Sequence, residues 1–341
     1  MSRIPACVLL FLAAPAAAEP AAPPVIAIGG YLDTYYMYSL GRPADGATAL
    51  RLESVHGGFT VAAAAIEATA TAERWHARVV VQAGADAAAV SVVEPVPSTW
   101  QPLREASAGV SLGGDVTVDA GLMLSPIGPE SLVSKDDWNW SRSTAFVALP
   151  TYHVGVRATR PLGGGVTAQA WLVNGWNAAT DGNRGKTALI GATRVDGGTT
   201  IALLYAGGVE ATGTDAPWRH LLDGYAIVAV TDRVDVMAHV DGGIEGERRW
   251  LTGALYARAR ATDTVEVAAR VDGLREWSDA PSLLGVERVV AATATASWRA
   301  AAQVLLRAEL RHDRAGDPVF PDGDALGRTQ TTATTALTAW F

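Results

Sequence analysis

Apolar and polar residues alternate through successive segments of roughly ten residues, and this period limits the fold of the chain more than any other feature. Residues 74–83 are the clearest case: Trp75 and Val79 fall on one face, while His76 and Arg78 fall on the other. Because successive side chains of a strand point to opposite faces, one side of such a strand can meet lipid while the other meets water.

The hydrophobicity of the chain is spread through this alternation instead of being concentrated in runs. Mean hydropathy is +0.15. Yet beyond residue 18 no apolar run reaches the roughly 18 residues that a membrane helix needs. The pattern therefore predicts an all-β protein, a transmembrane antiparallel β-barrel. The formal net charge of −8 argues against nucleic acid as a partner, since nucleic-acid binding calls for a basic face.

Short turns rich in Gly, Asp and Pro alternate with longer polar connections. Seven short and eight long connections predict sixteen strands in one barrel, with both chain ends on the short-turn side, although fourteen or eighteen strands stay open. The predicted strands are 26–39, 56–71, 74–84, 102–112, 115–124, 150–160, 165–174, 185–195, 198–207, 219–230, 233–243, 248–260, 263–274, 284–297, 300–312 and 328–341.

The first residues have the pattern of a secretory signal peptide. Arg3 precedes an apolar run at 8–14, and three alanines come before residue 19. We therefore expect a signal peptide at 1–18 and a barrel domain at 19–341. Cys7 falls in the removed part, which leaves the exported chain without a disulfide or a thiolate metal site.

The last segment, 329–341, alternates and ends on Phe341. A terminal aromatic residue on such a strand resembles the signal that the outer-membrane barrel assembly machinery reads, so we expect that machinery as a partner. Outer-membrane lipid is the other partner that the apolar face predicts.

A central stretch carries a resemblance to a known family. Its parts are the insertion Trp138–Ser143, the segment Pro150–Arg157 and the strand end Asn174–Asn177, with the tyrosine-rich Gly30–Tyr36 near the start. Together they resemble the OmpL-like β-barrel porin family of bacterial outer membranes. The resemblance implies an integral multi-pass barrel of the outer membrane that acts as a channel, but it assigns no binding residues.

The connection 125–149 is the longest that we expect. In porins one long loop commonly folds into the lumen and narrows it, which makes Lys135, Asp136, Asp137 and Arg142 candidate constriction residues. A solvated loop on the outer rim is an equally good interpretation, because the sequence does not give the direction of a loop.

Charged residues of both signs fall on the predicted inner faces of the strands. They either form a charged ring that sets ion selectivity or pair with one another along a wet interior, and pairing is the better interpretation for most of them. The excess of arginine favours anionic or polar solutes. The predicted lumen-facing residues are Arg74, His76, Arg78, Asp119, Arg157, Arg194, Asp235, Asp241, Arg258, Arg270, Arg307 and Glu309.

Catalytic chemistry has little support in the sequence. No GxSxG, HExxH or phosphate-loop motif occurs, and His76, His153 and His239 fall on inward polar faces. We therefore expect no catalytic residue, no cofactor and no metal ion.

The sequence thus predicts an outer-membrane channel for passive diffusion of small hydrophilic solutes, narrowed by the 125–149 loop. A plugged barrel with a structural or adhesive role is the alternative. A homo-oligomer stays open, because an apolar subunit interface looks the same in sequence as a lipid-facing surface.

Overall fold

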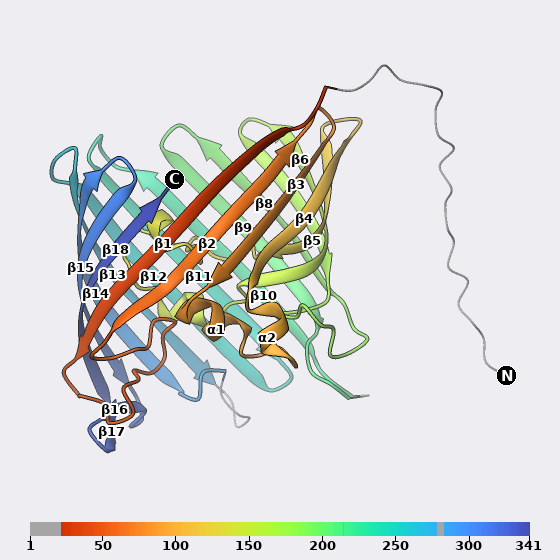
Figure 1. Cartoon of the computed structure of the whole chain (residues 1–341). Helices are drawn as coiled ribbons and strands as arrows, with labels where there is room; N and C mark the ends of the chain where they lie inside the picture. Colours follow the sequence, from red (N-terminus) through yellow and green to blue (C-terminus); the bar gives the residue numbers. More distant parts are fainter. Residues whose placement is uncertain (1–21, 214, 278–282) are drawn as a thin grey trace.

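The computed structural model describes residues 22–213, 215–277 and 283–341, so the predicted signal peptide and Cys7 lie outside the described residues. Sixteen antiparallel strands form one closed barrel, in which β1 pairs with β2 on one side and with β18 on the other (Figure 1). The barrel strands are β1 (Val25–Ser39), β2 (Phe59–Thr71), β3 (Trp75–Ala83), β4 (Leu103–Leu112), β5 (Val116–Leu124), β6 (Tyr152–Gly163), β7 (Val166–Val173), β8 (Thr187–Asp196), β9 (Thr199–Val209), β10 (Trp218–Ala229), β11 (Val234–Glu245), β12 (Arg248–Arg260), β13 (Val265–Trp277), β14 (Arg288–Ala301), β15 (Val304–Ala315) and β18 (Thr329–Trp340).

The predicted strand number and order are confirmed, and closure explains why this arrangement suits a membrane. Every strand has a hydrogen-bonded neighbour on both sides, so no sheet edge exposes unpaired backbone groups to hydrocarbon. The largest shifts, of four residues, are at β14 and β15, which begin at Arg288 and Val304 instead of residues 284 and 300. Val286 of the connection before β14 folds inward and is buried in an apolar cluster, which delays the start of that strand.

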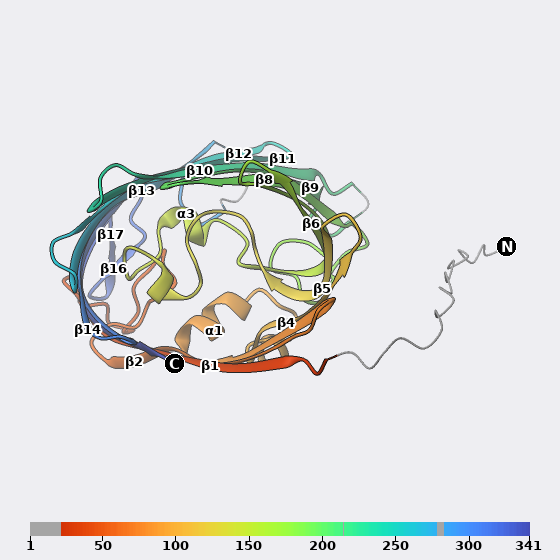
Figure 2. The same cartoon turned by 90° about the horizontal axis from the view of Figure 1, so that it is seen from above.

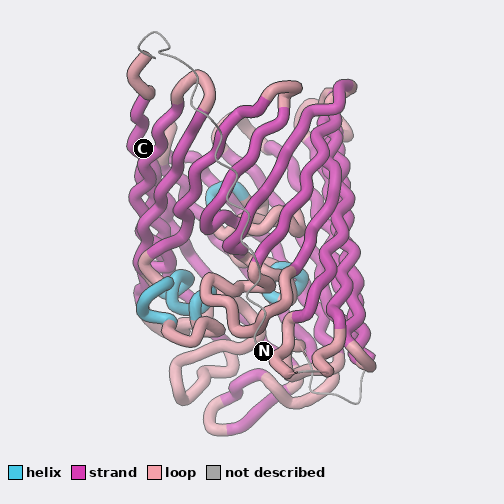
Figure 3. The backbone as a smooth tube through the Cα atoms, turned by 90° about the vertical axis from the view of Figure 1, so that its right-hand side faces the viewer, coloured by secondary structure: helices cyan, strands magenta, loops and turns pink. Residues whose placement is uncertain are grey.

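The two ends of the barrel differ in their connections. Short turns join the strands at the end where Val25 and Phe341 lie, and the long connections gather at the opposite end (Figures 1 and 3). By the rule for bacterial barrels, the short-turn end faces the periplasm and the long-loop end faces outward.

Large aromatic residues are exposed on the outer surface near both ends of the strands. Residues of this kind at the short-turn end are Trp75, Trp298 and Phe341, and those at the long-loop end are Phe59, Trp218 and Trp277. Two such belts mark the levels at which a barrel meets the membrane interfaces. Between them the outward positions are mainly apolar, as the alternation predicts.

The long connections contain short elements of their own. These are α1 (Ala85–Ser91), α2 (Pro97–Trp100), the 3-10 helix η1 (Ser134–Asp136), α3 (Thr144–Val147) and a two-stranded ribbon of β16 (Phe320–Asp322) and β17 (Ala325–Gly327). Among the residues that the structure describes, none of the helices has the length and apolar character that a membrane crossing needs.

Apolar side chains fill part of the interior near the long-loop end. Met123, Trp171, Leu221 and Trp250 point inward from the ends of their strands and form one buried cluster with Leu149 from the connection before β6. The barrel is therefore packed inside, at this level, against its own loops.

Candidate functional site: the loop inside the barrel

The connection between β5 and β6, residues 125–151, lies inside the barrel. Figure 2 shows it crossing the interior together with α3, while α1 enters from the opposite wall. Loop residues are hydrogen-bonded to inward side chains of β1, β10, β13, β14 and β15. Of these, β13, β14 and β15 lie across the lumen from the loop's own strands, while β1 and β10 flank the loop on either side, so the loop spans the channel axis.

The first anchor joins the loop to β1 and β15. Ser134 donates from Oγ to Oδ2 of Asp33 at 2.6 Å, and the indole N–H of Trp140 donates to the same carboxylate oxygen at 3.1 Å. Glu309 accepts the backbone N–H of Trp140 at 2.8 Å, while Arg307 donates to the carbonyl oxygen of Ser134 at 2.6 Å. Trp140 is only 1 % exposed as a result.

The second anchor joins the loop to β13. Arg270 donates to the carbonyl oxygen of Ser141 at 2.5 Å and forms an ion pair with Glu130 at 3.1 Å. Asp272 accepts the backbone N–H of Thr144, at the start of α3, at 2.7 Å. An arginine and an aspartate on one inward face thus bind the loop backbone by its carbonyl and amide groups.

Arg142 links three of the long connections to one another. Its guanidinium donates to Oε1 of Glu53 at 2.5 Å and lies 3.7 Å from carboxylate oxygens of both Asp86 and Asp137. It also donates to the carbonyl oxygen of Leu132 at 2.5 Å. The Arg142 side chain is fully buried, so one cation stabilises the packing of three loops inside the lumen.

The charge balance around Arg142 changes the acidity of its partners. Burial raises the pKa of Asp86 and of Asp137 well above the usual 3.8, because the loss of water outweighs the attraction of Arg142. Burial would lower the pKa of Arg142, but the attraction of Glu53, Asp86 and Asp137 outweighs it and the pKa is raised. Arg142 therefore stays charged at every relevant pH.

The predicted constriction residues separate into two pairs. Lys135 and Asp136 form an ion pair at 2.6 Å, and their side chains are 28 % and 51 % exposed. Asp137 and Arg142 are buried in the loop cluster, which differs from the expectation that they line the path. Their charges fix the loop in place and do not face water.

Two of the predicted lumen-facing residues lie elsewhere. Arg194 pairs across the sheet with Ile201, an exposed outward residue, so the register of β8 places it on the outer face near the short-turn end. A long cation can reach the headgroup region from there, which explains why the position tolerates it. Arg74 precedes β3 and lies in a short turn.

The rest of the predicted set lies on inward strand positions, where its members form ion pairs or hydrogen bonds to the loop. Asp119 binds both His76 and Arg157, at 2.7 and 2.9 Å, and Asp241 lies beside His239. Asp235 binds Arg258 at 2.8 Å. The other members are Arg78, paired with Glu67 and Glu105, and Arg270, Arg307 and Glu309, which contact the loop.

Of the acidic partners of the loop, Asp33 and Glu309 follow from the alternation, which places both on inward faces, whereas the others were missed by sequence reasoning. Asp272 also occupies an inward position of its strand and could have been found in the same way. Glu53, Asp86 and Glu130 lie in long connections, where no period shows the direction of a side chain. Their pairing with arginines is visible only in three dimensions.

Solved porins share this fold. The chain matches an anion-selective porin from Comamonas acidovorans with a TM-score of 0.63 and 14 % identity, covering 93 % of this chain and 100 % of that one. It matches the trimer form of OmpT from Vibrio cholerae with a TM-score of 0.61 and 9 % identity, over 94 % and 100 % of the two chains. A porin from Rhodopseudomonas blastica, in a triple mutant, has a TM-score of 0.55 and 15 % identity, over 93 % and 100 %. At these identities the likeness shows the fold alone.

No curated protein sequence matches this chain. The sequence model of one family, described as "Putative beta-barrel porin-2, OmpL-like", matches residues 25–341 and so spans the whole barrel. The closed barrel of sixteen antiparallel strands agrees with that match. The chain therefore belongs to the OmpL-like β-barrel porin family, and it is an integral β-barrel of the bacterial outer membrane.

Proposed function

We propose that this porin-type barrel allows passive diffusion of small hydrophilic solutes and that the loop 125–149 narrows its path. The observation that carries the proposal is the position of the loop, which spans the interior and is hydrogen-bonded to the opposite wall. A loop fixed on both sides of a lumen restricts the size of the solutes that pass.

The charge of the inner wall supports a preference for anions. Near the short-turn end, Asp235 is shared by Arg258 and Arg260, whose side chains are 24 % and 40 % exposed, so two cations pair with one carboxylate there. Arg260 also lines a hollow of about 360 Å³ at this end, where Arg233 and Arg299 lie with the acidic Asp232, Asp263 and Glu266. The proposed anion preference therefore rests on the pair Arg258 and Arg260, since a locally positive surface raises the concentration of anions.

Liposome swelling with sugars of graded size tests the narrowing. Leu124 and Tyr152 are paired neighbours, so a short Gly-Ser turn can replace residues 126–150 without altering the strands. The matched control replaces residues 322–325, at the exposed tip of the β16–β17 ribbon, by Gly-Ser residues and keeps the buried Phe320. We expect the first variant to admit larger sugars and the control to behave like the natural chain. Equal size limits in all three proteins would contradict the proposal.

A plugged barrel is the second candidate, and the interior packing favours it. Leu149 and Ile127 of the loop lie in the same buried cluster as Trp171 and Trp250 of the wall. In that case the natural chain would give no swelling even with the smallest sugar, whereas the loop variant would swell.

We also propose that Phe341 is read by the barrel assembly machinery. Its side chain is 73 % exposed on the outer face at the short-turn end, where a periplasmic factor can reach it. Phe341 also exchanges backbone hydrogen bonds with Gly30, so the aromatic residue directly follows the last strand.

A further inference from the structure

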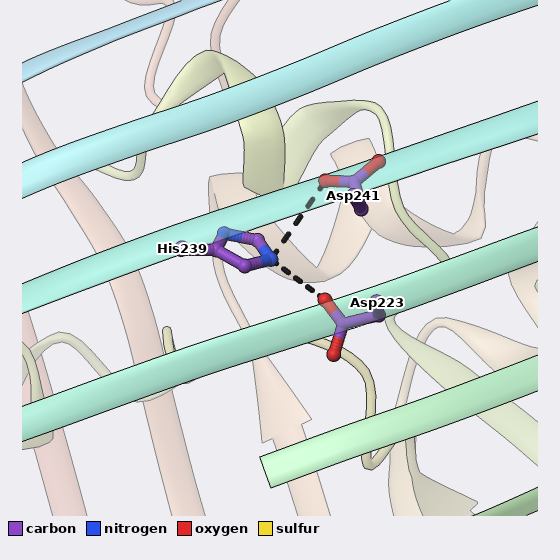
Figure 4. A group of neighbouring side chains, drawn as sticks. All are labelled: Asp223, His239 and Asp241. Carbon is purple, nitrogen blue, oxygen red and sulfur yellow. Dashed lines mark hydrogen bonds and ion pairs between the residues drawn. The ribbon is translucent and has the colours of Figure 1, made fainter. Parts of the chain in front are cut away.

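One buried group of three side chains on the inner wall has the composition of a metal site. Asp223 of β10 and His239 and Asp241 of β11 lie together on the inner wall (Figure 4). Nε2 of His239 is 2.7 Å from Oδ1 of Asp223 and 3.7 Å from Oδ2 of Asp241. One potential ligand atom from each of the three residues lies within 4.8 Å of the others.

The strand register builds this group. Asp223 and Asp241 are directly opposite each other across the β10–β11 pair, and His239 follows two positions along on the same face as Asp241. Two rigid, paired strands therefore present all three side chains, which gives the group a fixed geometry of the kind that metal sites require.

The charges of the group are not balanced by the protein. All three side chains are at most 1 % exposed. Within residues 22–213, 215–277 and 283–341, ion pairs to Asp223 and Asp241 come from His239 alone. Even with a protonated imidazole, two buried carboxylates leave one negative charge without a partner, and burial of such a charge is costly.

One buried carboxylate oxygen of the group, Oδ1 of Asp241, also lacks a hydrogen-bond partner among the described residues. The other oxygen of Asp241 accepts a hydrogen bond from the hydroxyl of Thr252. Unsatisfied groups of this kind in a buried site need an explanation, and an ion is one of the standard ones.

A second histidine-aspartate pair on the inner wall shows the contrast. His76 and Asp119 also lie 2.7 Å apart, but Arg157 supplies the balancing cation at 2.9 Å. The His76 side chain is 38 % exposed to water. The neighbour of Asp119 is thus an arginine, Arg157, whereas the neighbour of Asp223 is a second carboxylate, Asp241.

We propose that Asp223, His239 and Asp241 bind a divalent cation of the Zn²⁺ type. Two carboxylates and a neutral imidazole carry two negative charges, which a divalent ion neutralises. An imidazole ligand selects Zn²⁺ and similar transition-metal ions over Ca²⁺ and Mg²⁺, which prefer oxygen ligands. Ligand atoms around tetrahedral Zn²⁺ lie roughly 3.3 Å apart, between the 2.7 and 3.7 Å separations seen here.

The site is connected to the loop that crosses the lumen. The backbone N–H of Gly128 donates to Oδ2 of Asp223 at 3.2 Å. Gly128 has a φ of +77°, and a Cβ atom there would lie 3.4 Å from Cε1 of His239 and 3.2 Å from Leu149. Glycine thus lets the loop backbone approach the site. A bound ion would fix the position of Asp223, which accepts the hydrogen bond from Gly128 near the start of the loop.

Metal binding by the refolded full-length chain in detergent tests the proposal. Because the group is buried, the protein is refolded with Zn²⁺, with Ca²⁺ or with a chelator, and bound metal is counted after dialysis. Co²⁺ in place of Zn²⁺ gives visible absorption bands that report the ligand set. The variants are His239→Gln and Asp241→Asn, with His76→Gln as the matched control, and heat-dependent migration on gels shows which of them are folded.

We expect one Zn²⁺ per chain, no stoichiometric Ca²⁺, and a loss of affinity on the order of 100-fold or more in the two site variants. His76→Gln should bind like the natural chain. No retained Zn²⁺ in the natural chain, or equal loss in His76→Gln, would overturn the proposal. The Co²⁺ spectrum of the natural chain decides the matter even if a site variant does not fold, because absence of the intense bands excludes the four-coordinate site proposed here.

Discussion

Replacing Arg142 by methionine should release the loop from the lumen. The substitution keeps most of the length of the side chain but removes the cation that, among the described residues, forms the ion pairs with Glu53, Asp86 and Asp137. It also removes the hydrogen bond to the carbonyl oxygen of Leu132. Three carboxylates would then remain buried without a counterion.

The expected cost follows from the burial of the group. Removing one partner of a buried ion pair typically costs about 3–5 kcal/mol, because the other charge stays buried and unpaired. Since every 1.4 kcal/mol is a factor of ten, the population of the released loop should rise by roughly a hundredfold or more. Protonation of Asp86 and Asp137, whose pKa values burial already raises, should reduce this cost at acidic pH.

Limited digestion with chymotrypsin measures the released population. The sites after Trp138, Trp140 and Phe146 lie in the docked loop, and cleavage follows the open population when opening and closing are fast. We expect Arg142→Met to be cut there about a hundred times faster than the natural chain at neutral pH, with a smaller difference at pH 5.

The control is Arg157→Met, whose side chain is 32 % exposed and pairs with Asp119. Asp119 is 2 % exposed, but both residues belong to wall strands, β6 and β5, so the loss of this pair should leave the docking of the loop unchanged and digestion should change only a few-fold. Equal digestion of the Arg142 and Arg157 variants would refute the reasoning that burial of the charge cluster fixes the loop.

Three further predictions concern pH, selectivity and assembly. Burial raises the pKa of Asp86 and Asp137 above 3.8, so the ionised forms of these carboxylates oppose docking of the loop. Docking should therefore strengthen as the pH falls from the raised pKa values toward 3.8, and the current noise of the channel should fall with it. Noise that rises on acidification, or that is unaltered by Asp86→Asn, would count against this. The double change of Arg258 and Arg260 to glutamine should move the reversal potential in a salt gradient toward cation preference, and an unchanged potential would remove the wall arginines from selectivity. Deleting Phe341 should lower the amount of folded barrel in the outer membrane several-fold while refolding in detergent stays normal; a matching loss in detergent would indicate a stability effect instead.

The alternation predicted the barrel because strand geometry repeats every two residues and hairpin turns set the pairing. Predicted and observed boundaries of β12 are both 248–260, and the other strands differ by a few residues. Arg194 shows the limit of this reasoning. Near the end of β8 both faces carry polar residues, so polarity alone does not show which side chains point inward. The pairing of Arg194 with the outward Ile201 does show it.

The site was less predictable, because its contacts join distant parts of the chain. Arg142 and Glu53 are 89 residues apart and both lie in long connections without a period. Asp223 and Asp241 are different: the predicted turn at 231–233 places them opposite each other, so their proximity to His239 could have been derived from the register. Long-range ion pairs in loops have no comparable sequence signal.

Single-channel conductance of the refolded chain in a planar bilayer is the most direct test of the central claim, a water-filled path narrowed by a fixed loop. We predict small, stable current steps for the natural chain and larger steps for the variant that lacks residues 126–150. A barrel that is shown to be inserted and yet passes no current would contradict the channel and favour the plugged barrel.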